Sequence, residues 1–155
     1  MKTTQPIRWG ILACGGIARK FADDLAYVTD GYLAAVASRD ISRAQEFASH
    51  YSKEVKTYGS YEAMLSSGEI DVVYIASPHA LHYEHTILCL DAGIPVLCEK
   101  AFAINSQQVA AMIQKARDKN IFLMEALWTR FHPAVAKVQE ILASGVIGDV
   151  LHLEA

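Results

Sequence analysis

Cysteine, basic clusters and long apolar runs are all scarce in this sequence, and each scarcity excludes a class of protein. The three cysteines form no C-x-x-C pair and their number is odd, which argues against a disulfide framework and for reduced thiols. A formal net charge of −3, without any run of lysines or arginines, argues against a general nucleic-acid-binding surface. The longest apolar stretches have the length of strands, so no segment is expected to span a membrane.

The composition and the first residues indicate where the protein is located and that it is globular. The N-terminal M-K-T-T-Q-P lacks the apolar core of a secretion signal, and together with the unpaired thiols this predicts a cytoplasmic location. Hydrophobic residues make up 52% of the chain and charged residues 20%, which is typical of a globular protein. The 155 residues are enough for one domain with a sizeable core.

Apolar runs alternate with amphipathic stretches along nearly the whole chain. Strands are predicted near residues 7–12, 32–37, 55–58, 72–76, 95–98 and 121–124. Helices are predicted near residues 17–27, 42–51, 61–65, 83–92, 106–119 and 134–143. Because several of these strands are apolar on both faces, the sequence predicts an α/β domain, a doubly wound, Rossmann-like parallel sheet covered on both sides.

A corner of small residues between the first predicted strand and the first predicted helix organises the rest of the chain. It reads A-x-G-x-x-A, with Ala13, Gly15 and Ala18 at the small positions of a dinucleotide-binding loop. Gly15 would let the backbone approach a pyrophosphate, whereas the Cβ of Ala13 restricts the tight turn. Taken alone, the corner is equally typical of a plain strand-turn-helix. The cofactor contacts predicted here are Ala13, Cys14, Gly15, Gly16 and Ile17.

Cys14 lies just before the predicted helix, where a thiol inside a phosphate loop is expected to have a lowered pKa. The hypothesis is that alkylation of Cys14 abolishes cofactor binding, and that bound NADP slows the alkylation. The alternative is that Cys14 is an inert small residue.

The end of the second predicted strand offers a hydroxyl and a guanidinium where an acidic residue would read a ribose 2′-hydroxyl. Arg39 could pair with a 2′-phosphate or stack on adenine, and Ser38 could donate to the same phosphate. This pattern favours NADP as the cofactor, with NAD as the alternative. The other interpretation is a solvated loop arginine, with Asp40 merely capping the next helix.

Three histidines follow the fourth predicted strand, at the edge where open α/β sheets bind ligands. Ser77-Pro78 supplies a hydroxyl and a stiff turn suited to lining a nicotinamide ribose. The histidines recur every third residue, but a helix would spread them in angle and no cysteine or carboxylate completes a set, so no metal site is predicted. His79 and His82 are interpreted as polar groups near the substrate, and His85 as ordinary helix surface.

Glu99 and Lys100 close the fifth predicted strand, which is otherwise apolar. A solvated salt bridge in a loop is one interpretation. The other places Lys100 beside the nicotinamide, where burial and the positive ring of the oxidised cofactor would both favour the neutral amine, a proton acceptor. Glu99 could then accept hydrogen bonds from the hydroxyls of the nicotinamide ribose.

These motifs together resemble the Gfo/Idh/MocA family of oxidoreductases over essentially the whole chain: A-C-G-G-I-A, A-S-R-D, S-P-H-A-L-H and C-E-K. Residues 121–133 are similar to its trans-dihydrodiol dehydrogenase and NADP-dependent D-xylose dehydrogenase branch. The resemblance implies that Lys100 is the catalytic lysine and Glu99 its neighbour in the motif. It also implies that the nicotinamide and substrate pocket is lined by His79, His82 and Trp128.

Trp128 and Arg130 are therefore counted with the cofactor-binding residues, although core packing and a surface charge would be the simpler interpretation of the residues alone. Two positions depart from the family's pattern. Ala13 stands where the first glycine is usual, and Ala101 stands where E-K-P has its proline. Without the proline ring, the φ angle of the residue after Lys100 is less fixed, so the direction of the Lys100 side chain is not determined by the motif.

By the same resemblance, residues 1–148 form an NAD(P)-binding Rossmann domain. Residues 149–155 are expected to lead, as a strand or linker, into a second domain that this chain lacks and that supports the substrate and usually builds a dimer. Residues 150–153 alternate like a strand, which would invite association through an open edge. The full-length protein is expected to be a homo-oligomer.

The predicted function is NAD(P)-dependent transfer of a hydride between nicotinamide and a carbinol carbon. The implied substrate is a sugar, polyol or cyclic dihydrodiol, with Lys100 as proton relay and a residue of the second domain as its partner. The chain by itself is expected to bind cofactor and to turn over little. The alternatives are a non-catalytic NADP-binding regulator and a reductase of another substrate on the same scaffold.

Overall fold

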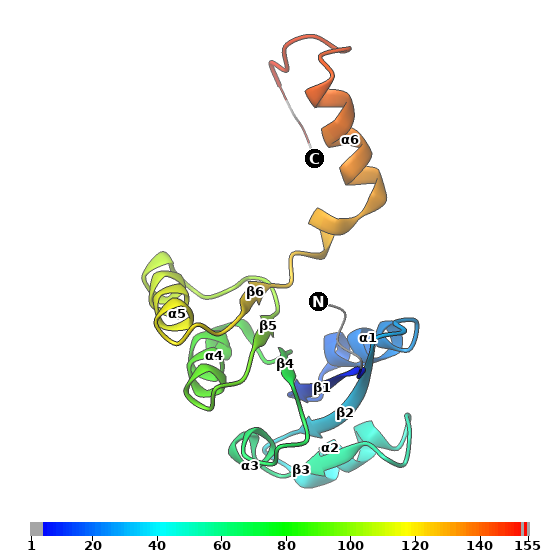
Figure 1. Cartoon of the computed structure of the whole chain (residues 1–155), viewed down its shortest axis with the longest axis vertical. Coiled ribbons are helices and arrows are strands. Elements are labelled where there is room, and N and C mark those ends of the chain that lie inside the picture. The colour runs from blue at the N-terminus through cyan, green and yellow to red at the C-terminus, as the bar shows by residue number, and fades with distance from the viewer. Residues whose placement is uncertain (1–4, 153, 155) are drawn as a thin grey trace.

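The computed structural model describes residues 5–152 and 154 as an α/β sandwich built on one parallel sheet (Figure 1). All five strand pairs are parallel, and the strand order is β3-β2-β1-β4-β5-β6. This order confirms the predicted doubly wound, Rossmann-like fold. The strands are β1 (Ile7–Leu12), β2 (Gly31–Ala37), β3 (Lys56–Tyr58), β4 (Val72–Ile75), β5 (Val96–Cys98) and β6 (Leu123–Glu125).

Each predicted helix is present, with ends shifted by up to three residues. The helices are α1 (Gly16–Leu25), α2 (Ile41–Ala48), α3 (Tyr61–Leu65), α4 (His82–Asp91), α5 (Ser106–Asp118) and α6 (Pro133–Ala143). Two short 3₁₀ turns were not predicted, namely η1 (His79–Leu81) and η2 (Trp128–Phe131). Both carry predicted site residues, so the site is less regular than the sequence pattern indicates.

Two apolar cores lie on opposite faces of the sheet, as a doubly wound fold requires. Small residues of α1 and α2, such as Ala18 and Ala44, pack with Ile11 and Val36 on one face. On the other face α3, α4 and α5 pack against Leu12, Val73 and neighbouring strand residues (Figure 1). The helices are thus placed so that the carboxyl ends of β1, β2 and β4 meet at one uncovered edge.

Side-chain caps start most of the helices that follow this edge. Asp40 accepts a hydrogen bond from the Ser42 N–H at 3.0 Å and so caps α2. Ser60 caps α3, and Asn105 caps α5. α1 differs, because its N-cap is Gly15 and no side chain bonds to its first turn.

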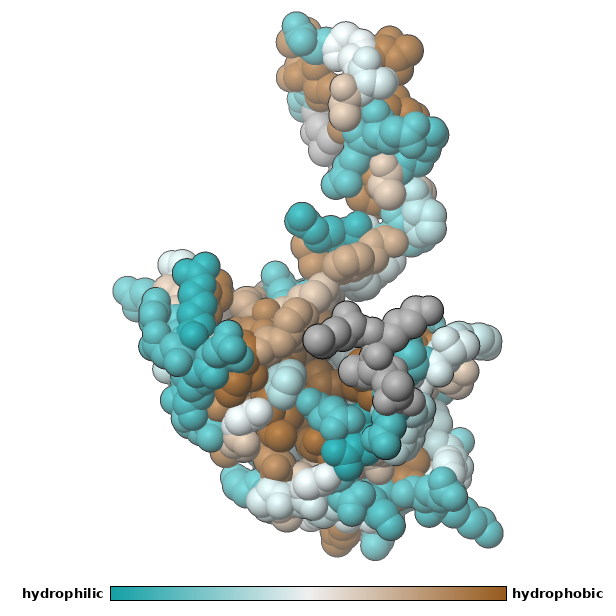
Figure 2. All heavy atoms as spheres, viewed as in Figure 1, coloured by the Kyte–Doolittle hydropathy of each residue, from teal (hydrophilic) through white to brown (hydrophobic). Residues whose placement is uncertain are grey.

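α6 projects away from the sheet and has no buried residues (Figure 1). Figure 2 shows apolar surface on this projecting part, which carries the exposed side chains of Val138, Val146 and Ile147. Residues 150–152 form no strand among the described residues, and position 153 lies outside them, so the strand at 150–153 stays a prediction. None of the helices in the described part is long and apolar enough for a membrane span.

Candidate functional site

A cavity of about 530 Å³ opens where the strand order reverses, beside the carboxyl ends of β1 and β4. Open α/β sheets bind ligands at this reversal. The loop after β1, the tip of β2 and the turn after β4 line the cavity together. It gathers the predicted residues Ala13, Cys14, Gly15, Gly16, Ile17, Ser38, Arg39, Ser77 and Pro78. It also gathers five residues that were not predicted as site residues: Asp40, Arg43, Tyr61, Ala76 and Leu81.

The first turn of α1 presents free backbone donors to this cavity. Gly15 has no side chain to cap the helix, and no acidic residue stands in the first turn. A Cβ on Gly16 would meet nothing within 4 Å, so the backbone there is accessible from the cavity. Uncapped N–H groups at the positive end of a helix dipole fit a pyrophosphate.

Ala13 makes the tight turn in the left-handed region, with φ of 76°. Its N–H donates to the carbonyl oxygen of Ala37 at 3.0 Å, which ties the loop after β1 to the end of β2. Glycine adopts this conformation without the steric cost that a Cβ brings. The expected restriction at this departure from the family's pattern is therefore present.

The prediction of a lowered pKa at Cys14 is wrong. Burial raises the pKa of the Cys14 thiol to about 11, which outweighs the opposing effect of the nearby Arg43 charge. The thiol donates weakly to the carbonyl oxygen of Ala37, with Sγ at 3.7 Å. Because only the thiolate is a good nucleophile, the inert alternative is the better account of Cys14.

The end of the cavity at the tip of β2 is basic. Ser38 is buried, whereas Arg39 is exposed and free to reach a ligand. Asp40 does not compete for a ribose, because its carboxylate bonds to Ser42 and these bonds hold the pKa of Asp40 below its ordinary value. Arg43, in the first turn of α2, lies on the same cavity. A second basic residue so soon after Arg39 in the sequence is the signal that could have identified it.

His85 is half-buried and bonded to Ser77 of the cavity, so it is not the ordinary helix surface that was predicted. Its Nδ1 lies 2.8 Å from the Ser77 hydroxyl, and its ring packs edge-on against Tyr61 at 4.9 Å between centroids. Burial lowers the pKa of His85 and raises that of Tyr61. Both residues support the Ser77 side of the cavity, and nothing in their local sequence announces this contact.

His82 is also placed differently from the prediction, since its side chain is fully buried at 0% exposure and cannot line a substrate pocket. Its Nδ1 lies 2.8 Å from the carbonyl oxygen of Ala101, and its Nε2 lies 2.9 Å from that of Ser77. His82 therefore joins the loop after β5 to the turn after β4. His79 is exposed, and its ring centroid is 5.4 Å from that of His82.

A second cavity, of about 600 Å³, adjoins the first, and Ile17 lines both. Its floor is the apolar face of β4, β5 and β6, and Trp128 of η2, 63% exposed, stands at its wall. Glu99 also lines it but is only 7% exposed. Both carboxylate oxygens of Glu99 already accept hydrogen bonds inside the domain, one from Tyr74 and one from the Lys100 N–H.

Lys100 follows β5 at the same edge of the sheet and is exposed, so the predicted burial is not provided by this domain. Its ammonium group makes no ion pair among the residues that the structure describes. Ala101 follows through a cis peptide bond. Arg130 lies on η2 and lines neither of the two cavities.

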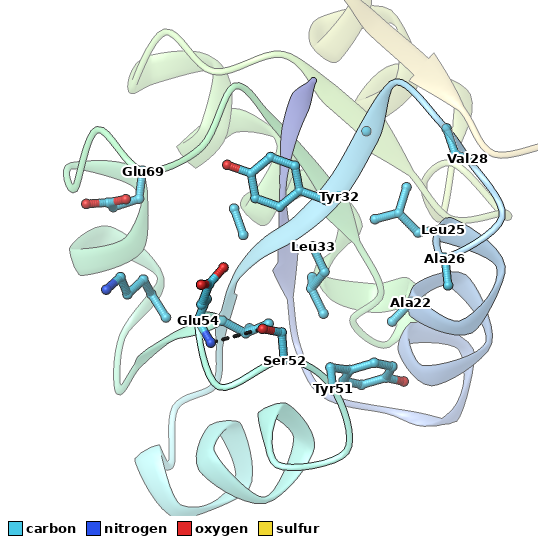
Figure 3. Close-up of a pocket in the computed structure, with 14 residues that line it drawn as sticks. Ala22, Leu25, Ala26, Val28, Tyr32, Leu33, Tyr51, Ser52, Glu54 and Glu69 are labelled. Carbon is cyan, nitrogen blue, oxygen red and sulfur yellow. Dashed lines mark hydrogen bonds between the residues drawn. The ribbon is translucent and has the colours of Figure 1, made fainter. Parts of the chain in front are cut away.

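A further hollow of about 710 Å³ lies near the amino end of β2, away from every predicted site residue. Figure 3 shows its lining by Leu25 and Ala22 of α1, Tyr32 and Leu33 of β2, and the segment around Tyr51. Its polar lining includes Glu54, Lys56 and Glu69. Within the described range, three or more His, Cys, Asp or Glu side chains are nowhere grouped as metal ligands.

Comparison with known proteins gives consistent matches over nearly the whole chain. The mouse trans-1,2-dihydrobenzene-1,2-diol dehydrogenase is 43% identical over 146 residues, which is 93% of this chain and 44% of that protein. The D-xylose 1-dehydrogenase (NADP(+)) of Hypocrea jecorina is 40% identical over 155 residues, 93% of this chain and 40% of that protein. The chain thus spans less than half the length of these curated relatives.

A solved structure and a family model agree with these relatives. The crystal structure of a 3-ketoreductase from Actinomadura kijaniata in complex with NADP matches with a TM-score of 0.86 and 32% identity, covering 94% of this chain and 46% of that one. The model of the GFO_IDH_MocA oxidoreductase family, which describes an NAD-binding Rossmann fold, matches residues 7–127. With the phosphate loop, the basic strand tip and the lysine after β5 all on one sheet edge, the chain belongs to the Gfo/Idh/MocA oxidoreductase family.

Proposed function

We propose that this chain is the cofactor-binding domain of an NADP-dependent oxidoreductase that acts on a CH–OH group of a sugar, polyol or cyclic dihydrodiol. One observation carries the proposal: the uncapped N-terminus of α1 opens into a cavity that Arg39 and Arg43 also line. A ligand with a pyrophosphate and a further phosphate matches that combination. The substrate class follows from the relatives, which are named for a dihydrodiol and for D-xylose.

The residues divide the cofactor among them. The N–H groups after Gly15 would hold the pyrophosphate, and Ser38 and Arg39 the 2′-phosphate, with Arg43 adding a second positive charge. The shared residue Ile17 then leads from the first cavity to the second, where Trp128 offers a flat apolar wall for the nicotinamide. The two cavities, which share Ile17, together offer a charged end for the phosphates and an apolar end for the nicotinamide.

The bound cofactor would supply the hydride acceptor or donor. The chain's own residues would position the cofactor and the substrate and would provide the path for the proton. Lys100 would take the hydroxyl proton of an alcohol in its neutral form, and return it in the reverse direction. His79, which is exposed on the turn after β4, would be a polar contact for the substrate. Positioning and a preorganised field would provide most of the rate enhancement.

Further features of the whole protein belong to the same proposal. Residues 1–148 are taken as the cofactor-binding domain and residues 149–155 as the strand or linker toward a substrate and dimerisation domain. A homo-oligomer in the cytoplasm is the expected form. Each of these features is proposed from the chain's resemblance to the family and from the sequence patterns given above.

The test is an assay of the protein that carries this chain, with NADP and a panel of pentoses, hexoses, inositols and dihydrodiols. Turnover of at least one polyol, reduced about a hundredfold or more by Lys100→Ala, is expected. Activity that survives Lys100→Ala would remove the proposed proton acceptor. Tight NADP binding without turnover of any substrate would favour the non-catalytic regulator instead.

A further inference from the structure

We infer that Tyr74 is a positioning residue that acts on Lys100 through the carboxylate of Glu99. The hydroxyl of Tyr74 lies 2.5 Å from Glu99 Oε1 and donates to it. The other oxygen, Glu99 Oε2, accepts from the backbone N–H of Lys100 at 3.0 Å. One carboxylate therefore bridges a side chain of β4 and the residue that we propose as the proton relay.

Tyr74 is held rigidly by its neighbours. It lies in the middle of β4 and is 2% exposed. Its ring stacks on Phe21 of α1, with 3.9 Å between centroids and 13° between planes. Phe21 in turn packs edge-on against Trp9 of β1 at 5.1 Å. The hydroxyl thus has little freedom, and a rigid donor fixes the orientation of the carboxylate that it bonds.

The bond to Tyr74 also matters because Glu99 is buried. A carboxylate that is 7% exposed needs donors to both of its oxygens, since an unpaired buried acceptor loses its hydration without compensation. Charge-assisted bonds from a hydroxyl are short and strong, which agrees with the distance to Tyr74. Burial and this bond raise the pKa of Tyr74 well above its ordinary value, so the phenol remains the donor.

Without the hydroxyl, the carboxylate would have one internal donor and would turn toward the solvent-accessible second cavity, which it already lines. The Lys100 N–H would then lose its acceptor. The ammonium group of Lys100 makes no ion pair among the described residues, so the backbone bond to Glu99 is a restraint that the domain places on this residue. The consequence for catalysis rests on the proposed function; the consequence for the Lys100 backbone does not.

The test compares Tyr74→Phe with Tyr51→Phe in the 155-residue chain. Tyr74→Phe keeps the stacked ring and removes only the hydroxyl. Tyr51→Phe is the matched control, because Tyr51 also donates to a carboxylate, Asp23 Oδ1 at 3.0 Å, but on the far part of α1. The readout is the amide proton resonance of Lys100 by NMR, with its hydrogen-exchange rate, in the absence of any cofactor.

Tyr74→Phe is expected to move the Lys100 amide resonance upfield and to speed its exchange about tenfold, whereas Tyr51→Phe leaves both unchanged. Glu99→Gln should produce a similar shift, and adding Tyr74→Phe to it should change nothing more, because the two act through one link. An unchanged Lys100 amide in Tyr74→Phe, or fully additive effects in the double variant, would overturn the inference.

A second arm applies to the protein in a form that turns over a polyol. There Tyr74→Phe should lower kcat about tenfold with little change in KM, and leave the Kd for NADP within about twofold, since the phosphate cavity is untouched. A KM effect with unchanged kcat would count against positioning of Lys100. Absence of NADP binding in the unmodified protein would instead overturn the proposed function, while the amide test would still decide the role of Tyr74.

Discussion

At the scale of single residues, Arg39 is the residue that we propose to discriminate between NADP and NAD. Arg39 is exposed on the cavity, and Asp40, the acidic residue among the described residues that line this cavity, is bound to Ser42. The site therefore offers a cation where a 2′-phosphate would lie and no free carboxylate to repel it.

Arg39→Ala is expected to weaken NADP binding by about 10- to 100-fold, the size of one or two charged hydrogen bonds. Binding of NAD, which lacks the phosphate, should change by about twofold or less. Calorimetric titration of both cofactors with both proteins measures this difference. Equal losses for NADP and NAD would mean that Arg39 only stacks on the adenine.

Ala13 offers a second test at this scale, because its Cβ stands in the left-handed region. Ala13→Gly should raise the free energy of unfolding by about 0.5–1 kcal/mol, since glycine removes the steric cost and loses part of that gain in the unfolded chain. The matched contrast is Ala18→Gly, inside α1 and fully buried, which should lower it by about 1 kcal/mol or more. Urea unfolding of the three proteins decides; destabilisation by Ala13→Gly would contradict the prediction.

Residue roles were predictable where they depend on the local chain, and were missed where they depend on contacts between distant segments. The small residues at 13–17 and the basic tip at 38–39 are local patterns, and the structure places them on one cavity. His85, Tyr61 and Tyr74 are defined by partners on other elements. The thiol of Cys14 was misjudged because burial, which the local sequence does not reveal, outweighs the helix N-terminus.

At the scale of elements, one ion pair fastens the sheet opposite the site. Arg8 of β1 binds both carboxylate oxygens of Asp71, just before β4, and also the carbonyl oxygen of Gly68. The hydrogen bond from Arg8 holds the pKa of Asp71 below its ordinary value. Both side chains are partly exposed, so solvent screens the pair and its contribution to stability is modest.

A folded-state pKa below the unfolded value means that this stability is present above about pH 4 and is lost as the pH falls through the folded value. Asp71→Asn should therefore cost stability at pH 7 and little at about pH 2, where the carboxyl is protonated in either state. Urea midpoints at the two pH values measure the difference. A cost that is the same at both would show that the carboxylate charge plays no part.

The elements themselves were predictable because apolar periodicity and capping residues are properties of short segments. The strands buried on both faces, such as β4, gave continuous apolar runs, and Asn105 marked the start of α5. The 3₁₀ turns η1 and η2 were not predicted, since such short turns have no periodicity of their own. The position of α6 was not predictable either, because an amphipathic pattern shows that a helix has an apolar face but not what covers it.

At the scale of the whole molecule, the two cores and both cavities lie in the part of the chain that precedes α6. No residue of α6 is buried, and none lines either cavity. The stability and the cofactor binding of the domain should therefore be independent of this helix.

A chain that ends at Phe131 is expected to unfold with a free energy within about 0.5 kcal/mol of the complete 155-residue chain, and to bind NADP with the same Kd within about twofold. Urea unfolding and calorimetry on the two chains provide the comparison. A large loss of stability would show that α6 packs on the sheet in solution.

Ile17 is a wall of both cavities. A dinucleotide that fills both the charged cavity and the apolar cavity would pass over this side chain. The size of residue 17 would therefore limit how closely the ligand can follow the surface between the two cavities. A larger side chain at position 17 would displace the apolar end of the ligand while the phosphates stay bound. Turnover would then fall although the affinity for the cofactor changes little. The same position would let a designer tune how deeply the reactive ring settles without altering either set of binding groups.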